Sequence, residues 1–168
     1  LDYLCMGIAE LCNISERRIE KMMNPIFSDL PAFLTKNSGL NSGLMIAQVT
    51  AAALVSENKI YCHPASIDSV PTSTDKEDHV SMGVTAARKL LLVIDNLKHV
   101  LSIEFLCNTQ ALYLQKPLKS SPPIEQLHAL IAKDVKEIGE DRVFADDMNH
   151  IYQLINNNMI LNTVEKVT

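Results

Sequence analysis

A run of ionisable residues lies near the middle of the chain, in the segment Asp75-Lys76-Glu77-Asp78-His79. Carboxylates and an imidazole placed this close together can move protons at a substrate or contribute ligands to a metal ion. Pro71 and several hydroxyl residues precede the run, and a long apolar pattern follows it. Because irregular polar segments between helices often carry function, we take this segment as the candidate functional site.

The same residues also suit the start of a helix, and on physical grounds alone this simpler explanation is favoured. Carboxylates at the N-terminus of a helix accept hydrogen bonds from its unpaired backbone N–H groups and complement the helix dipole. A metal site made of Asp75, Glu77 and His79 is disfavoured, because three ligands within five residues rarely close a site without distant partners. We therefore expect no metal.

Other groups of polar residues are better explained as ordinary helix surface. Asp146, Asp147 and His150 have helical spacing, which could bring a carboxylate and an imidazole together, yet most such groups form solvated faces. His99 and His128 lie within segments of helical periodicity. We expect both at the surface or at a helix edge rather than as ligands.

The segment Gly39-Leu40-Asn41-Ser42-Gly43 lacks the lysine and the preceding strand of a phosphate-binding loop. It suits the beginning of a helix instead, with Asn41 or Ser42 as the capping side chain. No nucleotide site is expected there.

The chain has four cysteines, Cys5, Cys12, Cys62 and Cys107, without the paired short spacing of a zinc site. Cys5 and Cys12 would lie about two helical turns apart, which is beyond the reach of a disulfide. We expect all four to be reduced thiols that pack as small buried residues.

The composition predicts a mainly α-helical protein. Hydrophobic residues make up 47% of the chain, aromatic residues make up 5%, and tryptophan is absent, which suits packed helices better than sheets. The formal net charge of −5 argues against nucleic acid as a partner, because phosphate binding needs clustered Lys and Arg. No uncharged apolar run reaches the roughly 18 residues of a membrane span.

The first residues suggest a piece of a longer protein. The sequence begins at Leu1 rather than at Met, with Leu4, Ile8 and Leu11 already at helical spacing. It shows no basic-then-apolar secretory pattern. We therefore expect a fragment of a cytoplasmic protein.

Apolar periodicity and helix-breaking residues predict a bundle of long helices. A first helix is expected over residues 1–12, followed by a break and a new cap at Ser15 for a short helix that ends before Pro25. The remaining expectations are a loop at 24–40, a helix at 42–60, an irregular connection at 64–76, a long helix at about 78–115, a proline-rich break at 116–123, a helix at 124–138 closed by Gly139, a last helix at 146–155 and a loose tail.

Several separate motifs occur in order along the chain: Ile14-Ser15-Glu16-Arg17-Arg18, Leu30-Pro31-Ala32-Phe33-Leu34, Gly39 to Ala47, Ala51-Ala52-Ala53-Leu54, Ser56-Glu57, Pro64-Ala65-Ser66 and Glu77-Asp78-His79-Val80-Ser81-Met82-Gly83. Together they resemble the C-terminal part of the histidine ammonia-lyases, in the family of aromatic amino acid lyases. The resemblance is dense over residues 1–116 and looser over residues 117–168. We therefore expect a family-like bundle with an active-site loop, followed by C-terminal helices.

The resemblance implies a carbon-nitrogen lyase that converts L-histidine to urocanate and ammonia in histidine catabolism. Enzymes of this family use a methylidene-imidazolone (MIO) formed from an internal Ala-Ser-Gly, and these 168 residues contain no such triplet. The tyrosine base and the other pocket residues also belong to the upstream part of the family's sequence. The chain alone is therefore expected to be inactive and to need the missing N-terminal part.

Glu77 resembles the active-site glutamate that histidine-specific members place beside the substrate and cofactor. A carboxylate can accept the imidazole N–H and influence proton movement at the substrate. Phenylalanine and tyrosine lyases usually have Gln at this position, so Glu77 favours histidine. Lys76, which would also lie next to the substrate and cofactor, departs from the Gln that commonly precedes the glutamate.

Two alternatives differ from this interpretation. The chain could belong to a phenylalanine or tyrosine ammonia-lyase or to an aminomutase, for which Gln would be expected at position 77. It could also be a non-catalytic helical oligomerisation module. The family forms homotetramers through its helical bundle, so the resemblance implies a homo-oligomer with exposed apolar stripes on an isolated chain.

Overall fold

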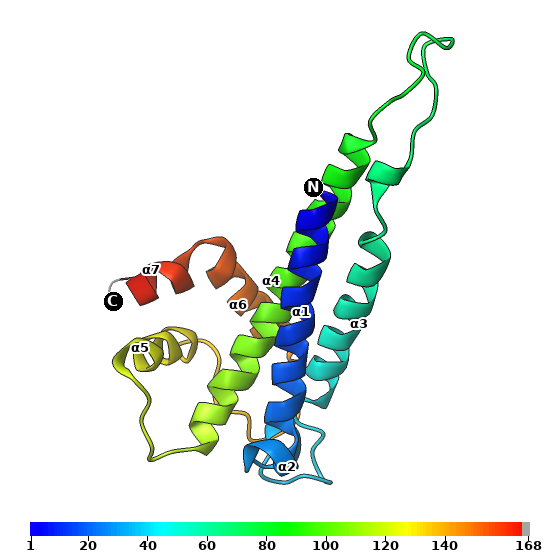
Figure 1. Ribbon diagram of the computed structural model, residues 1–168. Coiled ribbons are helices and arrows are strands. Elements are labelled where there is room, and N and C mark those ends of the chain that lie inside the picture. Colours follow the sequence, from blue (N-terminus) through cyan, green and yellow to red (C-terminus); the bar gives the residue numbers. More distant parts are fainter. Residues whose placement is uncertain (166–168) are drawn as a thin grey trace.

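A computed structural model describes residues 1–165 of the chain (Figure 1). Its helices are α1 (Asp2–Met23), α2 (Pro25–Ser28), α3 (Met45–Tyr61), α4 (Gly83–Leu114), α5 (Pro122–Ile131), α6 (Ala145–Asn156) and α7 (Met159–Glu165), with short 3-10 turns η1 (Ala32–Leu34) and η2 (Ala65–Ile67). The described residues contain no strand beyond two isolated bridges. The predicted mainly α-helical fold is confirmed.

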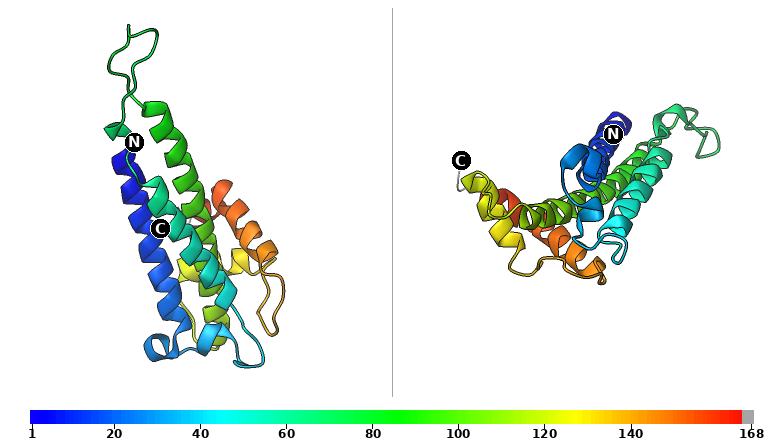
Figure 2. Two further views of the ribbon diagram at one scale, coloured as in Figure 1. Left: turned by 90° about the vertical axis from the view of Figure 1, so that its right-hand side faces the viewer. Right: turned by 90° about the horizontal axis from the view of Figure 1, so that it is seen from below.

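The long helix α4 is the centre of the molecule. It packs against α1, α3 and α6, and two perpendicular views show α1 and α6 on different sides of it (Figure 2). Its residues Val100, Ile103 and Leu106 are buried in the main core, to which all three neighbouring helices contribute. A smaller core cluster, built around Cys5, lies nearer the other end of α4. The long-helix bundle is therefore organised by apolar residues at helical spacing along α4.

The predicted break in the first helix is wrong, because α1 runs without interruption from Asp2 to Met23. Ser15 lies inside this helix, is fully buried, and donates its hydroxyl to the Glu104 carboxylate at 2.5 Å. Arg18 reaches the same carboxylate from one turn further along α1. The contact with α4 gives Ser15 a partner that the local sequence does not reveal, and tertiary packing overrides its preference for capping.

The predicted side-chain cap of α3 is also wrong. The helix begins at Met45, and neither Asn41 nor Ser42 supplies its cap. Instead, the Asp141 carboxylate accepts the amides of Ser42 and Gly43 at 2.7 and 2.8 Å. We call residues 34–44 the lower connection. Gly43 has a positive φ of 54°, and a Cβ there would lie 2.5 Å from the carbonyl oxygen of Phe33, so this position requires glycine.

Helix α5 is shorter than predicted, whereas α6 (Ala145–Asn156) contains the whole of the predicted last helix. Helix α5 ends at Ile131 rather than at 138, and the chain turns so that Val135 and Ile138 enter the core without helical structure. Gln110 of α4 holds this segment, since its amide donates to the carbonyls of Leu34 and Ile138 and accepts the Ile138 amide. These bonds replace helical ones.

The predicted loose tail is partly replaced by α7, which follows α6 as far as Glu165. The rest of that tail lies outside the described residues. Among residues 1–165, no helix is both long enough and apolar enough to span a membrane.

Candidate functional site

The segment that carries Glu77 projects from one end of the bundle, beyond the last turn of α3 and the first turn of α4 (Figure 1). We call residues 68–82 the Glu77 loop. Residues 71–79 are all exposed. The helix predicted from residue 78 begins only at Gly83, so the ionisable run is not a helix N-terminus and that simpler explanation is wrong.

Backbone hydrogen bonds give the Glu77 loop its shape. Thr72 and Glu77 pair through both of their backbone groups, at 2.9 and 3.3 Å. Between them the chain reverses through Ser73, Thr74 and Asp75, which all have positive φ. Closer to the bundle, Ser69 accepts the amide of Val80 on its hydroxyl at 2.9 Å. The two arms of the loop are thus tied at two levels, and this pairing takes the place of the expected helical turn.

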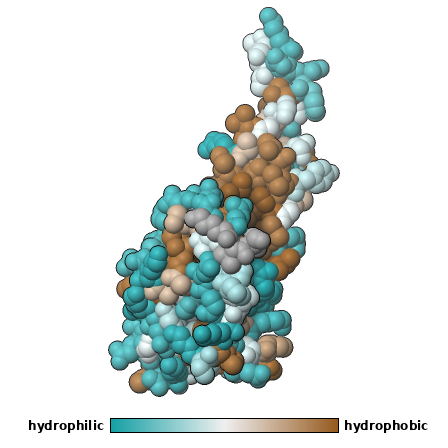
Figure 3. All heavy atoms as spheres, turned by 90° about the vertical axis from the view of Figure 1, so that its left-hand side faces the viewer, coloured by the Kyte–Doolittle hydropathy of each residue, from teal (hydrophilic) through white to brown (hydrophobic). Residues whose placement is uncertain are grey.

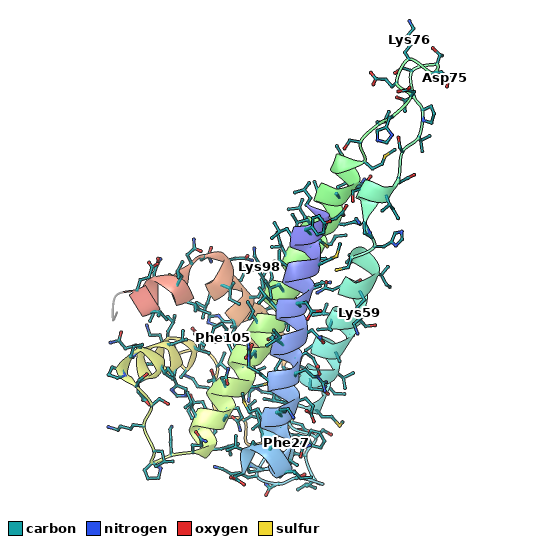
Figure 4. All side chains as sticks on the ribbon, in the orientation of Figure 1. Phe27, Lys59, Asp75, Lys76, Lys98 and Phe105 are labelled. Atoms are coloured by element: carbon teal, nitrogen blue, oxygen red, sulfur yellow. The ribbon has the colours of Figure 1, made fainter. Side chains whose placement is uncertain are left out.

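The Glu77 and Lys76 side chains are exposed, and neither forms a hydrogen bond or ion pair within the described residues. Figure 4 shows Lys76 and Asp75 at the extreme tip of the loop, directed away from the bundle. The carboxylate of Glu77 is therefore free to accept a donor from outside residues 1–165. Such an arrangement suits a side chain that acts on a group brought to the loop.

A polar cluster that the sequence analysis missed holds the base of the loop. The Asp2 carboxylate accepts the Ser66 amide at 2.9 Å and the Lys89 ammonium at 3.2 Å. Lys89 also donates to the His63 carbonyl. The Ser66 amide, followed by other donors that include Lys89, holds the pKa of the Asp2 carboxyl well below its usual value. Asp2 and Lys89 are 87 positions apart in the sequence, so no local sequence pattern indicates that they pair.

A cleft of about 770 Å³ lies beside this base, between the end of α3 and the start of α4. Its lining includes Ile60, Tyr61, His63, Asp68, Met82 and Lys89. The lining combines apolar side chains with the Lys89 ammonium and the acidic residue Asp68. The cleft adjoins the loop that bears Glu77.

The other candidate residues form separate surface contacts. Asp147 pairs with Arg142 at 2.8 Å, whereas His150 lies 3.3 Å from Asp134, so the predicted group at 146–150 does not assemble into one site. Within residues 1–165, no group of three or more His, Cys, Asp or Glu side chains could hold a metal ion.

The two helix-edge histidines each contact a tyrosine, as their partly exposed positions allow. His99 stacks on Tyr152 with ring centroids 4.3 Å apart, and His128 meets Tyr113 edge-on at 4.8 Å. These ring contacts join α4 to α6 and α5.

The cysteines include one close pair that sequence spacing did not indicate. The sulfur atoms of Cys5 and Cys62 are 4.0 Å apart, and all four thiols are free. Burial, followed by the neighbouring Cys62, raises the pKa of Cys5 to about 11. Burial also raises the pKa of Cys12 to about 11 and that of Cys107 further still. The thiols of Cys5, Cys12 and Cys107 therefore remain protonated near neutral pH.

Comparison with known proteins places the chain in a family. A family model described as aromatic amino acid lyase matches residues 1–133. A histidine ammonia-lyase from Symbiobacterium thermophilum is 52% identical over 167 residues, which cover 99% of this chain and 33% of the relative. The human histidine ammonia-lyase is also 52% identical, over 92% of this chain and 24% of the relative. The chain thus spans about a third or less of the length of these relatives.

Solved structures agree. A histidine ammonia-lyase from Trypanosoma cruzi matches with a TM-score of 0.95 and 49% identity, over 98% of this chain and 32% of that one. A tyrosine aminomutase from Streptomyces globisporus matches with a TM-score of 0.93 and 32% identity, over the same shares. The helical arrangement is common to both, and the sequence is closer to the first. The chain belongs to the aromatic amino acid lyase family.

Proposed function

We propose that this chain forms the C-terminal helical part of a histidine ammonia-lyase and supplies Glu77 to its active site. The observation that carries the proposal is a glutamate on an exposed, hydrogen-bonded loop in a chain about 50% identical to histidine ammonia-lyases. The complete enzyme would convert L-histidine to urocanate and ammonia.

A carboxylate at this position has a clear chemical use. It accepts the N–H of an imidazole, and charged acceptors make shorter and stronger hydrogen bonds than neutral ones. It can also hold or pass a proton at the substrate once water is excluded. Lys76, adjacent to it at the loop tip, would lie beside the substrate and cofactor.

The cofactor would come from polypeptide outside these 168 residues, because the MIO group forms from Ala-Ser-Gly and this sequence contains none. When present, that group supplies the electrophile that activates the amine for elimination. The free carboxylate of Glu77 suits a place beside such a group, since it has no competing partner within residues 1–165. The 168-residue chain alone would be inactive.

Exposed apolar residues support assembly into a homo-oligomer. Leu4 and Leu11 of α1 and Val84 and Leu91 of α4 are all more than half exposed. Figure 3 shows apolar residues gathered on the upper part of the bundle, between the loop tip and the C-terminal helices. Large apolar patches on an isolated chain mark places where other protein packs. We infer a cytoplasmic homotetramer, with neither nucleic acid nor membrane as a partner.

The same patches favour the second candidate, a non-catalytic oligomerisation module. The two candidates separate in one experiment on the complete polypeptide encoded by the gene that contains these 168 residues. Urocanate formation from L-histidine, with no product from L-phenylalanine or L-tyrosine, is expected. A well-folded oligomer without lyase activity would contradict the enzyme and support the module.

A chimaera provides a matched control for that experiment. The 167 residues of this chain that align with the Symbiobacterium thermophilum relative would replace the corresponding part of that relative. If the complete polypeptide is inactive but the chimaera is active, the segment itself is competent. If the chimaera assembles and is inactive, the proposed contribution of this chain is wrong.

A further inference from the structure

The ammonium group of Lys89 joins α4 to α1 and to the segment that follows α3. Lys89 extends from the second turn of α4, and its side chain is only 18% exposed. It contacts the Asp2 carboxylate of α1, whose side chain is 8% exposed, and the carbonyl of His63 just after α3. Asp2 in turn accepts the Ser66 amide of η2. One cation therefore ties α4 to α1 and to the segment leading into the loop.

The hydrogen bonds of the loop transmit this anchoring toward its tip. The Ser69 hydroxyl joins the two arms above the base, and the backbone pair of Thr72 and Glu77 joins them again next to the tip. The exposed residues 71–79 form no hydrogen bond to the helices of the bundle within the described residues. Any tilt at the base therefore displaces Glu77 by a larger distance than it displaces Ser66.

We propose that Lys89 is a positioning residue that acts through Glu77, by fixing the base of the loop through Asp2 and the His63 carbonyl. This inference rests on the proposed role of Glu77. A catalytic side chain must be held close to its productive geometry, and a misplacement of about 1 Å can cost about 10²-fold in rate. A half-buried lysine with two partners provides such a restraint, because removing it leaves the Asp2 carboxylate without its counter-charge.

A double-mutant cycle in the complete polypeptide tests the inference. Lys89→Met is expected to lower kcat/KM for histidine by between about tenfold and about 10²-fold. In the Glu77→Gln background the same substitution should change it less than about twofold, because a residue that acts through Glu77 has nothing left to position. Lys89→Arg, which keeps the charge, should recover most of the rate. Equal effects in both backgrounds would overturn the inference.

Backbone amide exchange gives a second readout that does not depend on activity. Lys89→Met should speed exchange at Ser66 and in the Glu77 loop, while the main core is unchanged. Lys98→Met is the matched control, because Lys98 lies on the same helix but bonds Asn156, away from the loop. Unchanged exchange in the loop would overturn the inference.

A variant with a smaller steric change guards against misfolding. Asp2→Asn retains the shape and an acceptor for the Ser66 amide but removes the charge that faces Lys89. Asp2→Asn should lower kcat/KM less than Lys89→Met does, and this loss should also largely disappear in the Glu77→Gln background. If the effects of Asp2→Asn and Glu77→Gln on kcat/KM are additive, the inference is contradicted. Absence of histidine deamination in the wild-type polypeptide would instead overturn the proposed function, and the positioning role with it.

Discussion

Helix α3 is preceded by the lower connection and followed by the segment that leads into the Glu77 loop, and both contain motifs that resemble the family. The two connections differ in how firmly they are bonded to the rest of the chain. The lower connection is fastened from several sides, by Gln110 on the Leu34 carbonyl, by Asp141 on the amides of Ser42 and Gly43, and by the ion pair of Lys36 with Glu137. Within residues 1–165, the Glu77 loop is anchored at its base, and its further hydrogen bonds run mainly between its own residues.

This difference indicates what each motif is for. The Leu34 carbonyl and the amides of Ser42 and Gly43 are bonded by side chains from other parts of the chain, so the motif of the lower connection serves the stability of the bundle, although the buried Thr35 hydroxyl has no hydrogen-bond partner within the described residues. The ionisable groups of the Glu77 loop remain exposed, with the carboxylate free. Unsatisfied charge at the tip of an ordered loop is useful when it meets another molecule or another part of the protein. Changes in the two connections should therefore affect different properties.

The largest effect is expected on activity, from Glu77→Gln in the complete polypeptide. Removing the charge while keeping the shape should lower kcat for histidine by about 10²-fold or more, a typical value for proton-transfer groups. The melting temperature and the oligomeric state should not change, because the side chain has no partner in the described chain. Steady-state kinetics measures kcat, thermal denaturation measures the melting temperature, and sedimentation measures the oligomeric state. A wild-type rate would remove Glu77 from the site.

The next effect concerns the lower connection. Gln110→Leu deletes three buried hydrogen bonds to the backbone of Leu34 and Ile138. Because each unsatisfied buried group is costly, we expect a loss of about 3 to 5 kcal/mol in the free energy of unfolding. Chemical denaturation followed by circular dichroism measures it. Gln115→Leu, the same change at an exposed position at the end of α4, is the control and should have little effect.

Asp141→Ala should cost less, because the backbone amides of Ser42 and Gly43 would be partly solvated after the carboxylate is lost. By analogy with helix capping, we expect a loss of about 1 kcal/mol in the free energy of unfolding. Glu140→Ala, at the exposed neighbouring position, serves as control. If both substitutions have the same effect, Asp141 does not fasten the lower connection.

The smallest effect concerns pH at the base of the Glu77 loop. The folded protein holds the pKa of Asp2 well below the value of about 3.9 in an unfolded chain. Its contribution to stability is therefore present above that unfolded value and is lost as the pH falls toward the folded pKa. The wild type should have a higher melting temperature than Asp2→Asn at neutral pH, and this gap between the two melting temperatures should narrow progressively below about pH 4. A gap independent of pH would exclude an ionic role.

Sequence reasoning located the helices well where apolar periodicity is long, as in α4, and less well at their ends. The error at Ser15 arose because Glu104 is 89 residues away, and no local pattern announces that bond. The start of α4 was placed too early because carboxylates suit both helix starts and exposed loops. The Thr72–Glu77 pairing decided between these structures.

The sequence by itself determined the mainly α-helical class, the family resemblance and the choice of Glu77, because periodicity, composition and ordered motifs are properties of the linear chain. Only the tertiary structure decided that α1 is continuous and that Lys89 and Asp2 hold the base of the Glu77 loop. It also decided that the Asp141 carboxylate bonds the segment just before α3, where the sequence predicted a cap by Ser42 or Asn41. These contacts join residues far apart in the chain. Their partners are selected by packing of helices in space, which a local pattern does not encode.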